Sequence, residues 1–134
     1  MKELDLRKVT DEVERMCIEG NYFIGKEVLD KIKEAYAKEE SEVGKNILGQ
    51  IIENDEIAMN EQVPMCQDTG IVVVFLEIGT EVKINGDIYE AVNEGVRRGY
   101  EKGYLRKSVV RHPLDRVNTK DNSPAIIHTN LVAN

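Results

Sequence analysis

The sequence predicts an α+β fold, in which N-terminal helices are followed by a small β-sheet with one packed helix. Apolar residues recur at helical spacing through the first half of the chain. The pattern then changes to short apolar runs at 71–78 and 125–132, which are typical of strands. A further amphipathic segment, 87–103, lies between these runs and is expected to pack on the sheet that they form.

The first two helices are expected at residues 4–19 and 24–38. Each carries an apolar stripe, and Gly20 with Asn21 is expected to end the first helix. Cys17 falls on the stripe of the first helix, where a cysteine packs as a small hydrophobic residue. We therefore interpret Cys17 as part of the core.

A third helix is expected after Ser41, because a serine hydroxyl suits the N-cap position. Its apolar residues continue to Ile52. Asn54 and Asp55 follow and are expected to break or bend the helix.

The second half of the chain is expected to form the sheet and its helix. A turn at 79–80 follows the first strand, and residues 81–84 are a candidate second strand paired back on it. The stretch 105–124 is expected to be a long irregular loop. In the helix at 87–103, three glycines lie on or near the apolar face and would allow close packing: Gly95, Gly99 and Gly103.

The bulk properties indicate a soluble globular chain without a visible internal domain boundary. The chain has 134 residues, a net charge of −7 and an isoelectric point of about 4.9, which argues against a nucleic-acid surface. No apolar run is long enough to span a membrane, and the N-terminus lacks a signal-peptide core. Two cysteines make no disulfide framework, so the cytoplasm is the expected compartment.

Residues 97–120 are basic although the chain as a whole is acidic. They contain eight lysines and arginines but only two acidic residues, Glu101 and Asp115. A basic segment on an acidic protein suggests a small anionic ligand or a partner surface.

Residues 64–70, PMCQDTG, place a thiol beside an amide, a carboxylate and a hydroxyl in a turn. One interpretation is structural: Asp68 and Thr69 cap backbone amides, and Cys66 is incidental. Cys66 could instead act as a nucleophile, although no histidine lies nearby in the sequence. It could bind zinc with the two histidines, although the spacing matches no closed zinc motif. It could also be one ligand of an iron cluster whose other ligands lie elsewhere.

The loop 105–124 combines polar groups, among them Arg106, with interleaved apolar residues. It could be a solvated surface loop. The interleaved valines and leucine would anchor it to a core, however, and an anchored arginine is a good carboxylate clamp. The guanidinium fork matches a carboxylate in a bidentate manner.

These two stretches resemble the α-subunit, or N-terminal region, of the class I (iron–sulfur) fumarate hydratases and the related L-tartrate dehydratases. The resemblance extends through essentially the whole chain and is specific for the family, but it separates fumarase from tartrate dehydratase poorly. It is carried by PMCQDTG at 64–70, GYLRKSVV at 103–110 and PLDRVNTKDNSPAIIH at 113–128.

Two residues depart from the family's pattern. His112 stands where the family commonly has Asp, and Lys120 stands where it commonly has Gly. The second change would disfavour a positive φ at that position. Both changes bear on the local loop conformation, and not on the family.

The resemblance implies a hydro-lyase of the tricarboxylic acid cycle that interconverts fumarate and L-malate through a 4Fe–4S cluster. In the family, three cysteine thiolates hold the cluster and leave one iron open. Only Cys66 matches a cluster cysteine, so this chain is expected to be a fragment of a longer α-region and inactive alone. A β-subunit, or the C-terminal region of the same enzyme, would complete the site in a homo-oligomer or heterotetramer.

The resemblance also assigns roles to individual residues. Cys66 would be the metal ligand, Gln67 and Asp68 would reach the substrate beside the open iron, and Arg106 would bind a carboxylate of the dicarboxylate substrate. Asp68 is also a catalytic candidate for transfer of the C3 proton, although a residue from the other half of the site is an equally good base. His128 is more simply a structural histidine on the last strand, although its place in the motif makes it a possible neighbour of the site. Four further residues are expected to shape the loop more than to touch substrate: Arg116, Asn118, Asp121 and Asn122.

Two alternatives remain open. The chain could belong to an L-tartrate dehydratase α-subunit. It could also be a non-catalytic module that binds a carboxylate or a partner subunit without chemistry.

Overall fold

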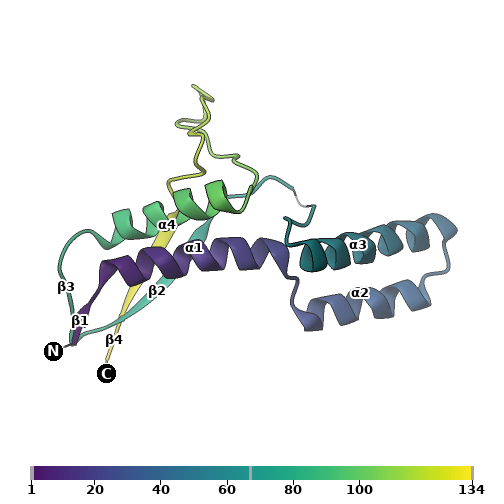
Figure 1. The fold of residues 1–134 in the computed structure, drawn as a ribbon, viewed down its shortest axis with the longest axis horizontal. Coiled ribbons are helices and arrows are strands. Elements are labelled where there is room, and N and C mark those ends of the chain that lie inside the picture. The colour runs from purple at the N-terminus through teal and green to yellow at the C-terminus, as the bar shows by residue number, and fades with distance from the viewer. Residues whose placement is uncertain (1, 67, 134) are drawn as a thin grey trace. The chain divides into compact units, whose positions relative to one another are not determined.

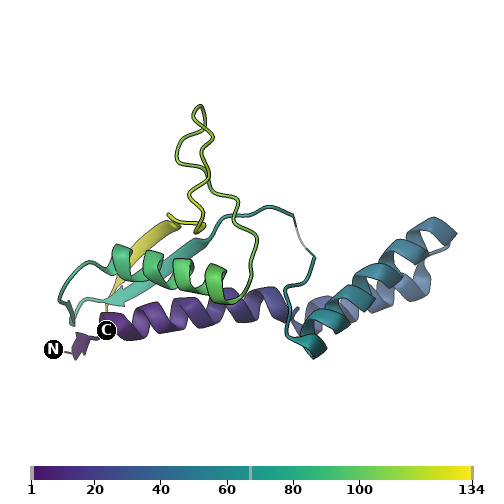
Figure 2. The same cartoon turned by 45° about the horizontal axis from the view of Figure 1, so that its top comes forward.

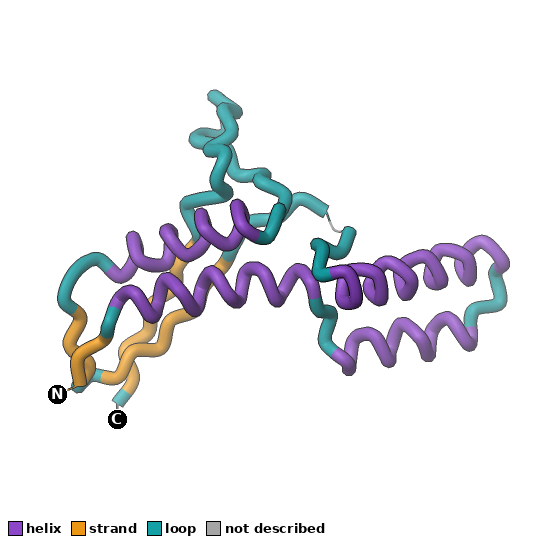
Figure 3. Tube along the Cα trace, viewed as in Figure 1, coloured by secondary structure: helices purple, strands orange, loops and turns teal. Residues whose placement is uncertain are grey.

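The computed structural model describes residues 2–66 and 68–133 and confirms the predicted α+β fold. Helices fill most of the first half of the chain, and short parallel strand pairs follow (Figures 1 and 3). Within the described residues the elements run in the order β1 (Lys2–Leu4), α1 (Leu6–Tyr22), α2 (Lys26–Lys38), α3 (Glu42–Glu61), β2 (Val73–Gly79), β3 (Val82–Ile84), α4 (Ile88–Lys102) and β4 (Ile126–Val132).

The chain divides into two compact units. One consists of Met1–Ile18 with Asp68–Asn134, and the other consists of Glu19–Gln67. No shift of composition marks this division, because one boundary falls inside α1 and the other falls inside the 64–70 segment. The first unit contains the strands, α4 and most of α1, and the second contains α2 and α3.

The main sheet pairs β2 with β4, as the sequence predicted, and the pairing is parallel. The register places Phe75 opposite His128. α4 belongs to the connection between the two strands, which is the crossover that a parallel pair requires. It lies across one face of the sheet (Figures 1 and 2), where the hydroxyls of Tyr89 and Thr129 are 3.1 Å apart.

Residues 81–84 do not pair back on β2, so that expectation is wrong. β3 pairs instead in parallel with β1, a short strand that precedes α1. Asp5 separates β1 from α1, because its Oδ1 accepts the Arg7 N–H at 3.0 Å in the manner of an N-cap. The neighbour of β3 is therefore the N-terminal strand β1, and not β2 as expected.

Two predicted helix ends are also wrong. α1 continues through Gly20 and Asn21 to Tyr22, and α3 continues past Asn54 and Asp55. Glycine costs about 1 kcal/mol relative to alanine in a helix, but the burial of Tyr22 (8% exposed) stabilises the last turn of α1. Asp55 is also buried, and Asn54 binds the loop that follows α3. Tertiary contacts therefore override the local preference at both places.

α2 and α3 form a helical hairpin connected by residues 39–41. Ser41 is the N-cap of α3, as predicted, and its Oγ accepts the Gly44 N–H at 3.3 Å. Lys33 and Glu56 form an ion pair of 3.0 Å across the hairpin, with both side chains about half exposed. Such a pair contributes at most about 1 kcal/mol. None of the described helices is both long and apolar enough to cross a membrane.

α1 and α4 approach closely along the predicted glycine stripe. A Cβ at Gly95 would lie 2.6 Å from the Thr10 carbonyl oxygen and 2.6 Å from Val13 Cβ. A Cβ at Gly99 would lie 2.7 Å from Cys17 Cβ. The expected close packing is confirmed, because neither position leaves room for a side chain.

The close packing predicts that Gly95→Ala lowers the free energy of unfolding by about 1–3 kcal/mol, because the added methyl group overpacks the helix contact. Gly20→Ala is the matched control, since nothing lies within 4 Å of a Cβ built there on α1. It should raise the free energy of unfolding by up to about 1 kcal/mol through helix propensity. Urea denaturation measures both variants, and equal effects would contradict the close approach of α1 and α4.

Candidate functional site

Cys66 lies exposed on the loop that follows α3, as predicted. Its backbone N–H donates to Asn54 Oδ1 at 2.8 Å. The preceding N–H, of Met65, donates to the carbonyl of Asn21 at 2.9 Å. Two consecutive peptide groups are therefore fixed, while the residue that carries the thiol remains accessible.

Cys17 shows the opposite environment, which confirms the predicted contrast between the two cysteines. It is buried on α1 at the contact with Gly99. Burial raises the pKa of the Cys17 thiol to about 11, because a low-dielectric environment disfavours the thiolate. Cys17 is therefore a core residue and a poor nucleophile at neutral pH.

These environments predict that a maleimide or iodoacetamide modifies Cys66 first in the folded chain. Cys17 should react only after denaturation, because its side chain is buried and its thiolate is scarce. Mass spectrometry of peptides after timed labelling measures both rates, and Cys66→Ser provides a chain that should take up no label until it unfolds. Similar rates at the two cysteines would show that one of them is misplaced.

Gln67 and Asp68 follow Cys66 in the segment 64–70, and the structure describes only the second of them. Gln67 lies outside the described residues. Asp68 is exposed, and its Oδ1 accepts the Thr69 N–H at 2.7 Å. This bond agrees with the predicted capping role of Asp68, and it leaves the second carboxylate oxygen available to a ligand.

Arg106 is exposed directly after a buried leucine at the end of α4. Leu105 is 4% exposed, and its N–H donates to the carbonyl of Tyr100 at 3.1 Å. No described residue forms a hydrogen bond or an ion pair with the Arg106 side chain. The backbone at Arg106 is thus anchored, whereas its guanidinium group is open to an anionic ligand.

Asn122 is fully buried and joins the two candidate stretches. Its Oδ1 accepts the N–H groups of Ser108 and Val109 at 2.6 and 3.0 Å, and its Nδ2 donates to the Gly70 carbonyl at 3.3 Å. Its φ of 60° is left-handed, a conformation that asparagine tolerates better than most residues. The sequence predicted only that Asn122 helps to shape the loop, because neither its burial nor its hydrogen-bond partners can be seen in a polar loop.

The Asn122 side chain links the backbone near Asp68 to the backbone near Arg106 by hydrogen bonds. Gly70 lies two residues after Asp68, and Ser108 lies two residues after Arg106. Both are bonded to the same carboxamide. Asn122 is therefore a positioning residue for the two candidate substrate ligands.

The contacts of Asn122 predict that Asn122→Gly lowers the free energy of unfolding by about 2–4 kcal/mol, because two buried N–H groups lose their acceptor. The amides of Ser108 and Val109 should then exchange hydrogen faster. Glycine keeps the left-handed backbone without strain, so only the side chain is tested. The matched control is Lys120→Gly, at φ 67° on the exposed surface of the same loop. It should leave these amides protected, and unchanged exchange in Asn122→Gly would remove the positioning role.

The loop 105–124 is ordered by backbone pairing, although it contains no regular strand. The Thr119 N–H donates to the Val109 carbonyl at 2.9 Å, and the Arg111 N–H donates to the Val117 carbonyl at 2.7 Å. The two sides of the loop therefore pair around a turn at 112–116. The stretch predicted to be irregular is therefore a hairpin-like loop that is held by backbone hydrogen bonds.

The two departures from the family's pattern are both accommodated. His112 Nδ1 accepts the Leu114 N–H at 3.2 Å, a bond that an aspartate in this place could also accept. Lys120 adopts a φ of 67° even though lysine disfavours it. Its N–H donates to Asn118 Oδ1 at 2.6 Å, which stabilises the turn.

Asp55 is a buried carboxylate that the sequence analysis interpreted only as a helix breaker. It is 6% exposed on α3, and its Oδ2 has no hydrogen-bond partner among the described residues. Burial raises the pKa of Asp55 above its ordinary value of 3.8. The folded chain then binds this proton more tightly than the unfolded chain, so stability falls as the pH rises through the raised pKa.

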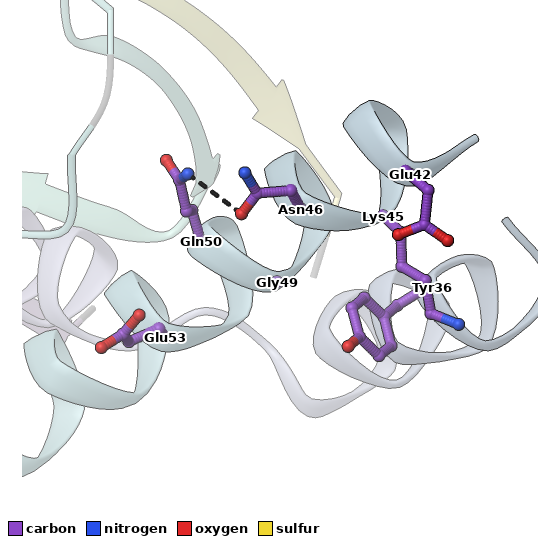
Figure 4. A pocket seen from close by; sticks show the side chains of 7 residues that line it. All are labelled: Tyr36, Glu42, Lys45, Asn46, Gly49, Gln50 and Glu53. Carbon is purple, nitrogen blue, oxygen red and sulfur yellow. Dashed lines mark hydrogen bonds between the residues drawn. The ribbon is translucent and has the colours of Figure 1, made fainter.

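A hollow on the α2–α3 hairpin contains none of the candidate residues. It is polar, and in Figure 4 the Gln50 side chain donates to Asn46, while Lys45 lies over the Tyr36 ring at 5.5 Å. It is lined by Tyr36, Glu42, Lys45, Asn46, Gly49, Gln50 and Glu53. These contacts are ordinary surface contacts of a hairpin and point to no reaction.

Among residues 2–66 and 68–133, no three His, Cys, Asp or Glu side chains gather closely enough to hold a metal ion. The exposed thiol of Cys66 fits one ligand position of an iron–sulfur cluster. Cys17 does not fit, because it is buried in the helix contact. The donor set of this chain therefore provides one thiolate of the three that the resemblance implies.

The family described as Fumarate hydratase (Fumerase) matches residues 10–134. This match covers most of the chain, so the chain belongs to that family, and the predicted resemblance to its α-subunit, N-terminal region is confirmed.

The chain is similar to α-subunits of tartrate dehydratases. It is 44% identical, over 117 residues and 86% of its length, to the "Putative L(+)-tartrate dehydratase subunit alpha" of Methanocaldococcus jannaschii. It is 28% identical, over 122 residues and 91% of its length, to the L(+)-tartrate dehydratase subunit alpha of Escherichia coli K12, and equally to that of Shigella sonnei. The chain spans 41% of the length of the first relative and 40% of the other two.

Proposed function

We propose that this chain is the N-terminal part of an iron–sulfur hydro-lyase α-subunit that interconverts fumarate and L-malate in the cytoplasm. The observation that carries the proposal is the family match over residues 10–134. The exposure of Cys66, Asp68 and Arg106 supports it, because each proposed ligand is accessible to a small molecule.

Arg106 is proposed to bind one carboxylate of the substrate. Its backbone is fixed after Leu105, and its guanidinium group has no partner among the described residues. A guanidinium fork can take both oxygens of a carboxylate at once. This contact would fix the orientation of a dicarboxylate, and further cationic ligands would come from the partner region.

Asp68 is proposed to contact the substrate and to take part in transfer of its C3 proton. One carboxylate oxygen is used by the Thr69 N–H, and the other is open. The dehydration of malate removes the C3 proton and the C2 hydroxyl group, so a positioned carboxylate can accept that proton. Gln67 is proposed to contact the substrate beside it.

Cys66 is proposed to be one thiolate ligand of a 4Fe–4S cluster, whose other two cysteines would lie in polypeptide outside this chain. When bound, such a cluster supplies a Lewis acid that makes the substrate hydroxyl a better leaving group. The residue suits this role because its peptide N–H is held by Asn54 while its thiol is accessible. The rest of the site would come from a partner subunit or region.

L-Tartrate is the second candidate substrate, and the names of the relatives favour it. Tartrate carries an additional hydroxyl group on C3, so its dehydration gives the enol of oxaloacetate instead of fumarate. The same carboxylate contacts would serve both substrates. Discrimination must then arise from groups that meet the second hydroxyl.

A chimaeric α-subunit tests the proposal. This chain replaces the matching 117 residues of the Methanocaldococcus jannaschii relative, and the product is combined with that organism's partner subunit and reconstituted anaerobically with iron and sulfide. Formation of fumarate from L-malate supports the first substrate, and formation of oxaloacetate from L-tartrate supports the second. Turnover of neither substrate by an enzyme with an intact cluster would overturn the proposal.

Arg106→Lys in this enzyme should lower kcat/KM for L-malate by roughly 30- to 1,000-fold, because losing the bidentate clamp costs about 2–4 kcal/mol. The visible absorption of the cluster should not change, since no thiolate is altered. Arg111→Lys, at an exposed position in the same loop, is the control and should keep full activity. Near-normal activity of Arg106→Lys, or a lost cluster, would remove Arg106 from the substrate site.

A further inference from the structure

The face of the β2–β4 sheet opposite α4 has no cover among the described residues of its own compact unit, 2–18 and 68–133 (Figures 1 and 2). Side chains alternate between the two faces of a strand. Thr129 meets Tyr89 of α4, so the residues on either side of Thr129 point away from that helix. Phe75 is 76% exposed, and Val73 and Ile126 are each 45% exposed. We call this surface the outer sheet face. It consists of Val73, Phe75, Glu77, Ile126, His128 and Asn130.

The outer sheet face is apolar at one end and polar at the other. Val73 pairs with Ile126, and the Phe75 ring stacks on His128 with centroids 5.0 Å apart and an interplanar angle of 13°. Glu77 and its neighbour on β4 form the polar end. A partner for this face must therefore present apolar side chains at one end and polar ones at the other.

The apolar end lies next to the candidate site. Val73 begins β2 three residues after Gly70, and Ile126 begins β4 four residues after Asn122. Gly70 and Asn122 are the residues whose hydrogen bond joins the two candidate stretches. A partner seated on this end would therefore bring its own side chains close to Asp68.

The strand sequence indicates that both faces of the sheet are meant to be buried. Parallel sheets are found almost only with cover on both faces, and their strands read as near-continuous apolar runs. β2 begins within such a run, since residues 71–76 are all apolar. A strand with one face in water would instead alternate apolar with polar residues. We therefore infer that the exposed ring of Phe75 is suited to pack against a further segment of polypeptide.

We propose that the outer sheet face docks the polypeptide equivalent to the unmatched three-fifths of the relatives' α-subunits. The relatives extend well beyond the part that this chain matches, which is 41% and 40% of their lengths. The occupant would contribute an apolar segment over Phe75 and polar groups beside Glu77. This inference rests on the proposed role as part of an α-subunit.

A second copy of the chain is the other occupant to consider. A two-fold dimer would bury the same face of both copies against each other. The longer α-subunits of the relatives favour a segment of the same subunit instead. A segment joined to this chain also acts at an effective concentration of about millimolar or higher. The dimer is therefore an outcome of the test and not the proposal.

The chain contains no tryptophan, so Phe75→Trp introduces a fluorophore on the outer sheet face. Its emission is compared between this chain alone and the chimaera with the remainder of the Methanocaldococcus jannaschii α-subunit, as a difference spectrum against the parent chimaera. The matched control is Leu114→Trp, at an 88% exposed residue of the loop. Hydrogen exchange of the β2 and β4 amides in the unsubstituted proteins gives a readout that needs no variant.

Docking should shift the emission of Phe75→Trp to shorter wavelength in the chimaera, with a several-fold loss of acrylamide quenching and slower exchange in β2 and β4. The fluorophore of Leu114→Trp should remain quenchable in both proteins. Full quenching of Phe75→Trp and unprotected strands in the folded chimaera would overturn the proposal. So would a concentration-dependent loss of quenching in Phe75→Trp of this chain alone, because that identifies a second copy as the occupant. A chimaera that shields this fluorophore but has no hydro-lyase activity would contradict the proposed function and leave the docking surface intact.

Discussion

The buried carboxamide of Asn122 is the contact on which the candidate site depends. A buried polar group lowers stability unless its donors and acceptors are paired. Here three of the partners are backbone groups, and these come from two segments far apart in the sequence. Asn122 can be satisfied only when Gly70 and Ser108 are both in place, so the two stretches acquire their geometry together and not one at a time.

The helices provide the rigid base from which these stretches extend. Thr10 Oγ1 donates to the Ala91 carbonyl at 2.9 Å across the buried contact between α1 and α4. Val92 and Val96 on the same helix have no exposed surface. The close packing that glycine permits thus fixes the end of α4, from which the loop with Arg106 begins. A site built on such an element is held more precisely than one carried by a loop alone.

The sequence was sufficient to predict the elements whose signal is local. The presence of the helices, the Ser41 cap and the glycine face of α4 follow from spacing and residue type, and all are confirmed. The partner of β3 could not be predicted, because it depends on a contact between residues 2–4 and 82–84. The long-range hydrogen bonds of Asn54 and Asn122 could not be predicted for a similar reason, because the sequence of an asparagine with distant partners looks the same as that of one in a solvated turn.

The motif at 64–70 is continuous in the sequence but belongs to two compact units. Cys66 lies in the same unit as Asn54, which holds its peptide group, and Asp68 lies in the same unit as Asn122. Each half of the motif therefore carries its own support. Exchange of residues 19–67 between related genes would replace the thiol together with its supporting helix and leave the carboxylate side unaltered. Such an exchange needs one crossover within α1 and a second within the motif, because residues 1–18 belong to the same compact unit as Asp68.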